Sequence, residues 1–131
     1  MSTDNCEGPL HPRAMTGVLL VNKGKYFDAH EELEAAWKEE RSKVRELYQG
    51  ILEAAVTYLH ITWGNYPGAV KVHARSMRWL NEWPETCRGV DVGQLRRDLD
   101  AAITEVKRLG SGRLSEFDQT MFKPILLTEN H

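Results

Sequence analysis

The chain has 131 residues, which suits one domain with a single hydrophobic core. Hydrophobic residues make up 41% and charged residues 27%, as in ordinary globular proteins, and the net charge of −2 argues against a generally basic nucleic-acid-binding protein. No stretch approaches the ~20 apolar residues that cross a bilayer, and the first residues lack the pattern of a secretory signal. We therefore expect a cytoplasmic protein that has neither nucleic acid nor membrane as a partner.

Apolar residues recur at intervals of three and four, which predicts an all-α, single-domain bundle. Pro12, Asn65 and Asp91 suit the starts of helices, whereas Gly24 and Gly110 suit positions just past helix ends. We expect a flexible leader over 1–10, one helical domain over 11–131, and helices over about 12–23, 26–40, 42–63, 66–83 and 91–109.

Two further features concern the ends of the chain. The segment after Gly112 is predicted to be extended and to pack back on the bundle through Phe122 and the apolar residues 125–127. Cys6 and Cys87 match neither a zinc-binding spacing nor a redox pair, so two free thiols in a reducing compartment are expected.

The helix predicted over 42–63 is apolar around most of its circumference, which is typical of a central, buried helix. Gly50 fits this position, because a glycine lets a neighbouring helix approach closely while costing ~1 kcal/mol of helix propensity. One narrow stripe of this helix is mostly polar. Its members recur at helical spacing and are Gln49, Glu53, Val56 and His60.

The helix predicted over 26–40 places His30 and Glu34 inside an otherwise apolar arc, one turn apart. A short connection makes this helix and the next antiparallel neighbours, so the start of one faces the end of the other. His30 is then expected near His60, and Glu34 near Val56 or Glu53. A buried carboxylate without a partner is costly, which favours a single site where the two polar stripes meet.

Two motifs occur in order along this part of the chain. The first runs from Gly24 to Glu34 (GKYFDAHEELE) and is followed by Trp37; the second reads QGILEAA from Gln49, followed by His60, Gly64-Asn65 and Gly68-Ala69. They resemble the two signatures of the family called domain of unknown function 309, over about residues 14–82. The signature positions are Tyr26, His30, Glu31, Glu34, Trp37, Gln49, Gly50, His60, Gly64 and Asn65.

The resemblance implies a small all-α fold, often a homodimer, and no established activity. The sequence departs from the family at Glu53, where glutamine is usual. This change adds a negative charge that could favour cations in a pocket. Alternatively, Glu53 is protonated or paired with a cation, and the binding properties are unchanged.

The set His30, Glu34, Glu53 and His60 leaves three interpretations open. It forms a structural hydrogen-bond network, or it binds a divalent metal such as zinc, manganese or iron, although the complete metal-binding helix motifs are missing. In the third interpretation it lines a small-molecule or catalytic pocket with a histidine as general base. The ligand-pocket candidates are Tyr26, His30, Glu34, Trp37, Gln49, Glu53 and His60.

The function that we expect from these observations is that of a small dimeric helical protein. Its polar site between the helices over 26–40 and 42–63 is structural or binds a small ligand. The alternative is an enzyme, such as a metal-assisted hydrolase, that uses His30, Glu34, Glu53 and His60.

Overall fold

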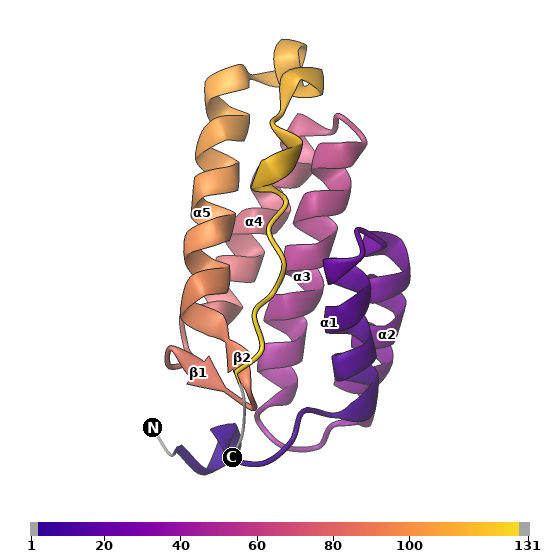
Figure 1. Cartoon of the computed structure of the whole chain (residues 1–131), viewed down its shortest axis with the longest axis vertical. Helices are drawn as coiled ribbons and strands as arrows, with labels where there is room; N and C mark the ends of the chain where they lie inside the picture. Colours follow the sequence, from indigo (N-terminus) through magenta and orange to yellow (C-terminus); the bar gives the residue numbers. More distant parts are fainter. Residues whose placement is uncertain (1–2, 129–131) are drawn as a thin grey trace.

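The computed structural model describes residues 3–128, and its α-helices run alternately up and down, as Figure 1 shows. The prediction of an all-α fold is confirmed. The α-helices are α1 (Pro12–Asn22), α2 (Tyr26–Glu39), α3 (Arg45–Thr62), α4 (Tyr66–Leu80) and α5 (Val92–Leu109). Short 3-10 helices lie at Thr3–Cys6 (η1), Ser111–Glu116 (η2) and Gln119–Met121 (η3), and a small antiparallel hairpin joins β1 (Thr86–Cys87) to β2 (Val90–Asp91).

The helix boundaries follow the local signals in the sequence. The Asn65 side chain accepts a hydrogen bond from the Gly68 N–H (3.1 Å), and Asp91 accepts one from the Gln94 N–H (3.0 Å), so both predicted N-caps are confirmed. Gly110 follows α5 with a φ of 73°, which glycine adopts readily. Within residues 3–128, no helix combines the length and apolarity needed to cross a membrane.

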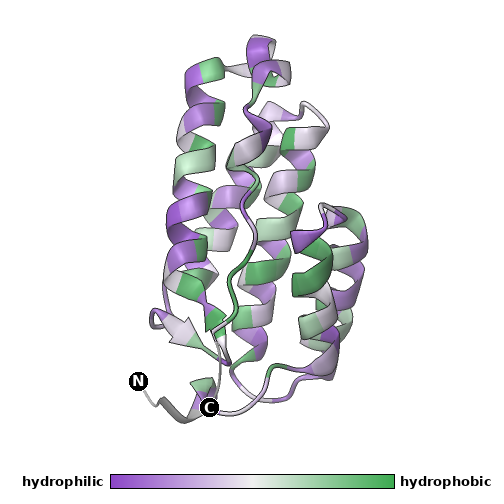
Figure 2. Ribbon diagram, viewed as in Figure 1, coloured by the Kyte–Doolittle hydropathy of each residue, from purple (hydrophilic) through white to green (hydrophobic). Residues whose placement is uncertain are grey.

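Helix α3 lies at the centre of the bundle, with α2 packed on one side and α4 on the other, as predicted. The antiparallel arrangement of α2 and α3 places the ring of Tyr26 5.5 Å from that of Tyr58. A Cβ atom built on Gly50 would lie 2.6 Å from Leu80 Cδ2, and the Ser76 hydroxyl donates to the Gly50 carbonyl (2.9 Å). Gly50 therefore sits at the close α3–α4 contact that the sequence predicts. The outer helix α5 has the amphipathic pattern of such a bundle, polar outside and apolar inside (Figure 2).

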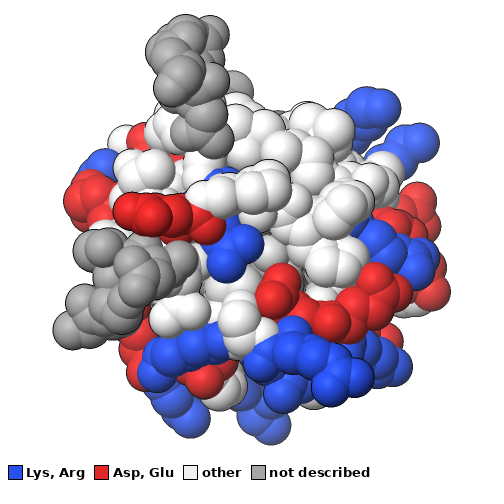
Figure 3. All heavy atoms as spheres, turned by 90° about the horizontal axis from the view of Figure 1, so that it is seen from below, with Lys and Arg blue, Asp and Glu red and all other residues white. Residues whose placement is uncertain are grey.

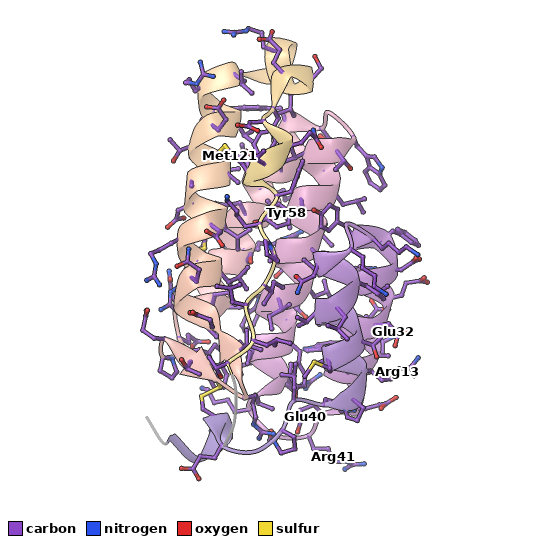
Figure 4. The ribbon with its side chains drawn as sticks, in the orientation of Figure 1. Arg13, Glu32, Glu40, Arg41, Tyr58 and Met121 are labelled. Carbon is purple, nitrogen blue, oxygen red and sulfur yellow. A yellow bond between two sulfur atoms is a disulfide. The ribbon has the colours of Figure 1, made fainter. Side chains whose placement is uncertain are left out.

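The N-terminal segment is attached to the hairpin. Cys6 and Cys87 form a disulfide, visible in Figure 4, so the expectation of two free thiols is wrong. Arg88 strengthens the attachment, because its Nε donates to the Asn5 carbonyl (2.6 Å) and its Nη1 donates to the Pro9 carbonyl (3.0 Å). The described part of the expected flexible leader is thus fastened to the fold, while residues 1–2 lie outside the described residues.

The C-terminal segment descends along the bundle to the hairpin (Figure 1), where the Thr128 N–H donates to the Gly89 carbonyl (2.7 Å). The Asn22 side chain fixes this segment with two hydrogen bonds. It donates to the Ile125 carbonyl (3.0 Å) and accepts from the Ile125 N–H (2.7 Å). Leu127 then pairs with Val90 in an antiparallel bridge. The predicted return of this segment onto the bundle is therefore confirmed.

Candidate functional site

The polar stripe of α3 makes contacts with both α2 and α4. At its lower end, the guanidinium carbon of Arg45 lies 4.4 Å from the centroid of the Trp37 ring of α2. Further along, Glu53 pairs with Arg75 of α4. We call this surface the α3 polar face; its residues share one side of the helix and are Arg45, Gln49, Glu53, Val56 and His60.

Glu53 is the most deeply buried charged residue of this face, with 6% of its surface exposed. Its Oε1 lies 2.9 Å from Arg75 Nε, whereas its Oε2 is buried without a hydrogen-bond partner. The ion pair agrees with one of the two interpretations left open for this residue. Leaving a buried acceptor unpaired costs about 1–3 kcal/mol, and more for a charged group. Glu53 Oε2 is thus a buried acceptor for which residues 3–128 supply no donor.

His60 is half-buried two turns further along α3. Because Asn65 Oδ1 accepts the Gly68 N–H, the Asn65 amide nitrogen faces His60 and donates to His60 Nδ1 (3.1 Å). Burial, and secondarily the nearby Arg75, lower the pKa of His60, so the ring is neutral at neutral pH. In a neutral ring whose Nδ1 accepts, Nε2 carries the proton. His60 therefore offers an N–H donor and is not placed to act as a general base through Nε2.

The α2 residues of the predicted site have other neighbours. Glu34 Oε1 lies 3.6 Å from Lys38 Nζ on the same helix. The centroid of the His30 ring lies 6.1 Å from that of the Phe27 ring. Among residues 3–128, no hydrogen bond or ion pair joins His30 or Glu34 to Glu53 or His60. Glu34 therefore pairs with Lys38 and Glu53 pairs with Arg75. We had expected each polar stripe to find its partners in the other stripe.

The metal interpretation of this set lacks geometric support. In the described part of the chain, no three His, Cys, Asp or Glu side chains lie close enough together to hold a metal ion. The donor set of His30, Glu34, Glu53 and His60 is thus divided between two helices and their separate partners. A divalent cation would have at most part of the ligand shell that such ions require.

The remaining candidates are divided between two regions. The half-buried Gln49 belongs to the α3 polar face, and Trp37 of α2 borders this face through its contact with Arg45. Tyr26 instead packs against Tyr58 and Phe122, beneath the C-terminal segment. Figure 4 shows Tyr58 behind this segment, which also carries Met121.

The sequence interpretation missed Arg75, because helical periodicity places it on the outer side of α4. The signal that could have found it is physical. A buried glutamate needs a counter-charge, and α4, which packs closely against α3, carries three cations and no acid. Arg45 was missed because it lies one turn before Gln49, the first residue of the predicted stripe.

Comparison with known proteins agrees with the motifs. Residues 15–72 match the family described as Domain of unknown function (DUF309). The chain is similar to this family over that region. The DUF309 match includes Glu53 and His60 of the α3 polar face and stops before Arg75.

Two curated proteins similar to this chain are themselves uncharacterized. One, from Aquifex aeolicus (strain VF5), is 25% identical over 83 residues, which are 63% of this chain and 25% of that protein. The other, YpuF from Bacillus subtilis (strain 168), is 30% identical over 89 residues, which are 66% of this chain and 51% of that protein. The chain thus spans about a quarter and about half of these relatives' lengths. No solved structure matches it.

Proposed function

We propose that this protein binds a small polar molecule at the α3 polar face and that it does so without catalysing a reaction. The observation that carries this proposal is the buried Oε2 of Glu53, which has no hydrogen-bond partner. Buried polar atoms in native proteins are nearly always paired, and an unpaired one calls for a specific explanation. A donor group on a ligand supplies the missing hydrogen bond.

Two neighbouring groups define what else the ligand presents. The Arg75 side chain is 47% exposed and binds Glu53 through Nε, which leaves its terminal N–H groups directed to solvent or to a ligand. The Nε2–H of His60 is a second donor on the α3 polar face. The matching ligand therefore carries a nitrogen donor for Glu53 close to an oxygen acceptor for Arg75, as a small zwitterion does. The protonated Nε2 of His60 favours binding over general-base catalysis.

The experiment is a calorimetric titration with three probes of one chain length: β-alanine, propylamine and propionate. We expect β-alanine to bind with millimolar affinity and at least tenfold more tightly than either singly charged probe, because it satisfies Glu53 and Arg75 together. Glu53→Gln removes the charge that attracts the ammonium group and should weaken β-alanine binding about tenfold, or ~1.4 kcal/mol.

Lys71→Ala is the matched control, since it removes an exposed cation from the same helix as Arg75. It should leave the affinity unchanged. Equal affinities of the three probes, no heat with β-alanine, or an unaltered affinity in Glu53→Gln would each contradict the proposal.

We further propose that two copies of the chain associate through the outer faces of α2 and α4, which have opposite charge. Helix α2 carries five acidic residues and one lysine, whereas α4 carries three basic residues and no acid. Adjoining bands of basic and acidic side chains are visible from below in Figure 3. A two-fold axis parallel to the helices places α2 of one protomer against α4 of its partner twice. The exposed rings of Phe27 (54%) and Trp63 (62%) supply apolar area for such a contact.

Light scattering tests this assembly. We expect a dimer at micromolar concentration that dissociates at high salt, because exposed charges are screened. Glu31→Lys, on the exposed side of α2, should give a monomer, and adding Arg78→Glu should restore the dimer. Glu116→Lys on η2 is the control and should remain dimeric. A monomeric parent protein at high micromolar concentration contradicts the proposal.

A further inference from the structure

A cavity of about 410 Å³ lies on the other side of α3, beneath the C-terminal segment. Its volume falls within the ~300–1,000 Å³ typical of small-molecule sites. None of its lining side chains carries a formal charge, and none belongs to the α3 polar face. The lining residues come from the end of α1, the α1–α2 turn, the start of α2, the end of α3 and the C-terminal segment, and are Val21, Asn22, Gly24, Tyr26, Thr62, Gln119, Phe122 and Pro124.

Two of the lining side chains, Tyr26 and Phe122, are aromatic. The rings of Tyr26 and Phe122 have centroids 5.9 Å apart and are tilted by 39°. Tyr58 packs behind them, with its ring 5.4 Å from Phe122. Aromatic rings favour offset or tilted contacts with another ring at these separations, so the ring of a bound aromatic molecule can pack against this pair in the same way.

The polar groups of the cavity are neutral, and they differ in which hydrogen-bond donors and acceptors are already paired within the protein. Both polar atoms of Asn22 are already bonded to the backbone of Ile125. The Thr62 hydroxyl donates to the Leu59 carbonyl (2.7 Å), which leaves its oxygen as an acceptor. Burial raises the pKa of Tyr26, so its hydroxyl stays protonated and is able to donate. The Gln119 amide adds a donor and an acceptor.

The C-terminal segment forms the roof through Gln119, Phe122 and Pro124. This roof is held in place at Ile125 by Asn22 and at Leu127 by the bridge to Val90. The cavity is therefore bounded by segments that are fixed before any ligand arrives, which reduces the entropy lost on binding.

We infer that this cavity binds a small, uncharged aromatic molecule that carries an amide-like hydrogen-bonding group. The ring lies against Tyr26 and Phe122, and the amide-like group meets the hydroxyl groups of Tyr26 and Thr62. A charged analogue is disfavoured because no lining side chain supplies a counter-charge, and burying an unpaired charge is costly. This site is independent of the one proposed at Glu53.

The test uses three probes with the same ring: benzamide, benzoate and benzylamine. We expect saturation-transfer NMR and titration to show benzamide binding at least tenfold more tightly than either charged probe. Thr62→Trp fills the cavity at the end of α3 and should weaken benzamide binding at least tenfold. Thr104→Trp is the matched control, because Thr104 is an exposed helical threonine whose hydroxyl likewise donates to a backbone carbonyl (2.8 Å).

Circular dichroism establishes that both variants are folded, and Gln119→Trp, at the exposed roof, replaces Thr62→Trp if that variant is not. Glu53→Gln should bind benzamide as the parent does, which separates this site from the α3 polar face. Absence of benzamide binding to the parent, equal binding of the charged probes, or unchanged affinity in the cavity-filling variant would overturn the inference.

Discussion

Removing the Cys6–Cys87 disulfide should lower the free energy of unfolding by about 2–4 kcal/mol. The two cysteines are 81 positions apart, so the bond closes most of the chain into one loop and restricts the unfolded ensemble. In the folded state, Arg88 still holds the N-terminal segment through the Asn5 and Pro9 carbonyls. The native bundle should therefore survive reduction, and the loss should appear in its stability.

Urea unfolding with and without a phosphine reductant measures this effect. The expected result is a lower midpoint in reductant with an unchanged far-UV circular dichroism signal before the transition. The double variant Cys6→Ala/Cys87→Ala is the control, and its midpoint should not respond to reductant. Identical midpoints for the oxidised and reduced parent would show that the bond contributes nothing to stability.

Gly50→Leu should lower the free energy of unfolding by about 1–3 kcal/mol, because the larger side chain overfills the α3–α4 contact. Even a Cβ atom at this position would lie 2.6 Å from Leu80 Cδ2 and 3.2 Å from Trp79 Cβ. Separating the helices would also stretch the hydrogen bond from Ser76 to the Gly50 carbonyl.

Gly112→Leu is the matched control, since a Cβ atom at Gly112 meets nothing within 4 Å. It should melt close to the parent temperature, whereas Gly50→Ala should fall between the parent and Gly50→Leu. A melting temperature of Gly50→Leu at or above that of the parent contradicts the close contact.

Features set by neighbouring residues were predictable from the sequence. Asn65 and Asp91 bond to backbone groups three residues away, so their capping roles are local properties. The apolar periodicity of α3 likewise predicts its central position. The start of α3 was predicted too early, because residues 42–44 form a turn before the helix begins at Arg45.

Features that depend on distant segments were not predictable in the same way. Periodicity assigns Glu53 to a face of α3, but it does not say which neighbouring helix supplies the counter-charge. The disulfide joins residues far apart in the chain, and it depends on a hairpin whose turn, Arg88-Gly89, departs from the usual Asn-Gly signal. Both turn residues have positive φ, 52° and 81°, as a tight two-residue hairpin requires.

The proposal that Glu53 serves a ligand rather than the stability of the fold is tested most directly by the free energy of unfolding of Glu53→Met in ligand-free buffer. Methionine has a similar volume and removes the unpaired Oε2, while Arg75 is exposed enough to be hydrated when its partner is lost. We predict a stability equal to that of the parent or higher by about 1 kcal/mol, as is common when a functional polar group is removed. A loss of about 2 kcal/mol or more would contradict this, because it would mean that the Glu53–Arg75 ion pair is needed to hold α4 against α3.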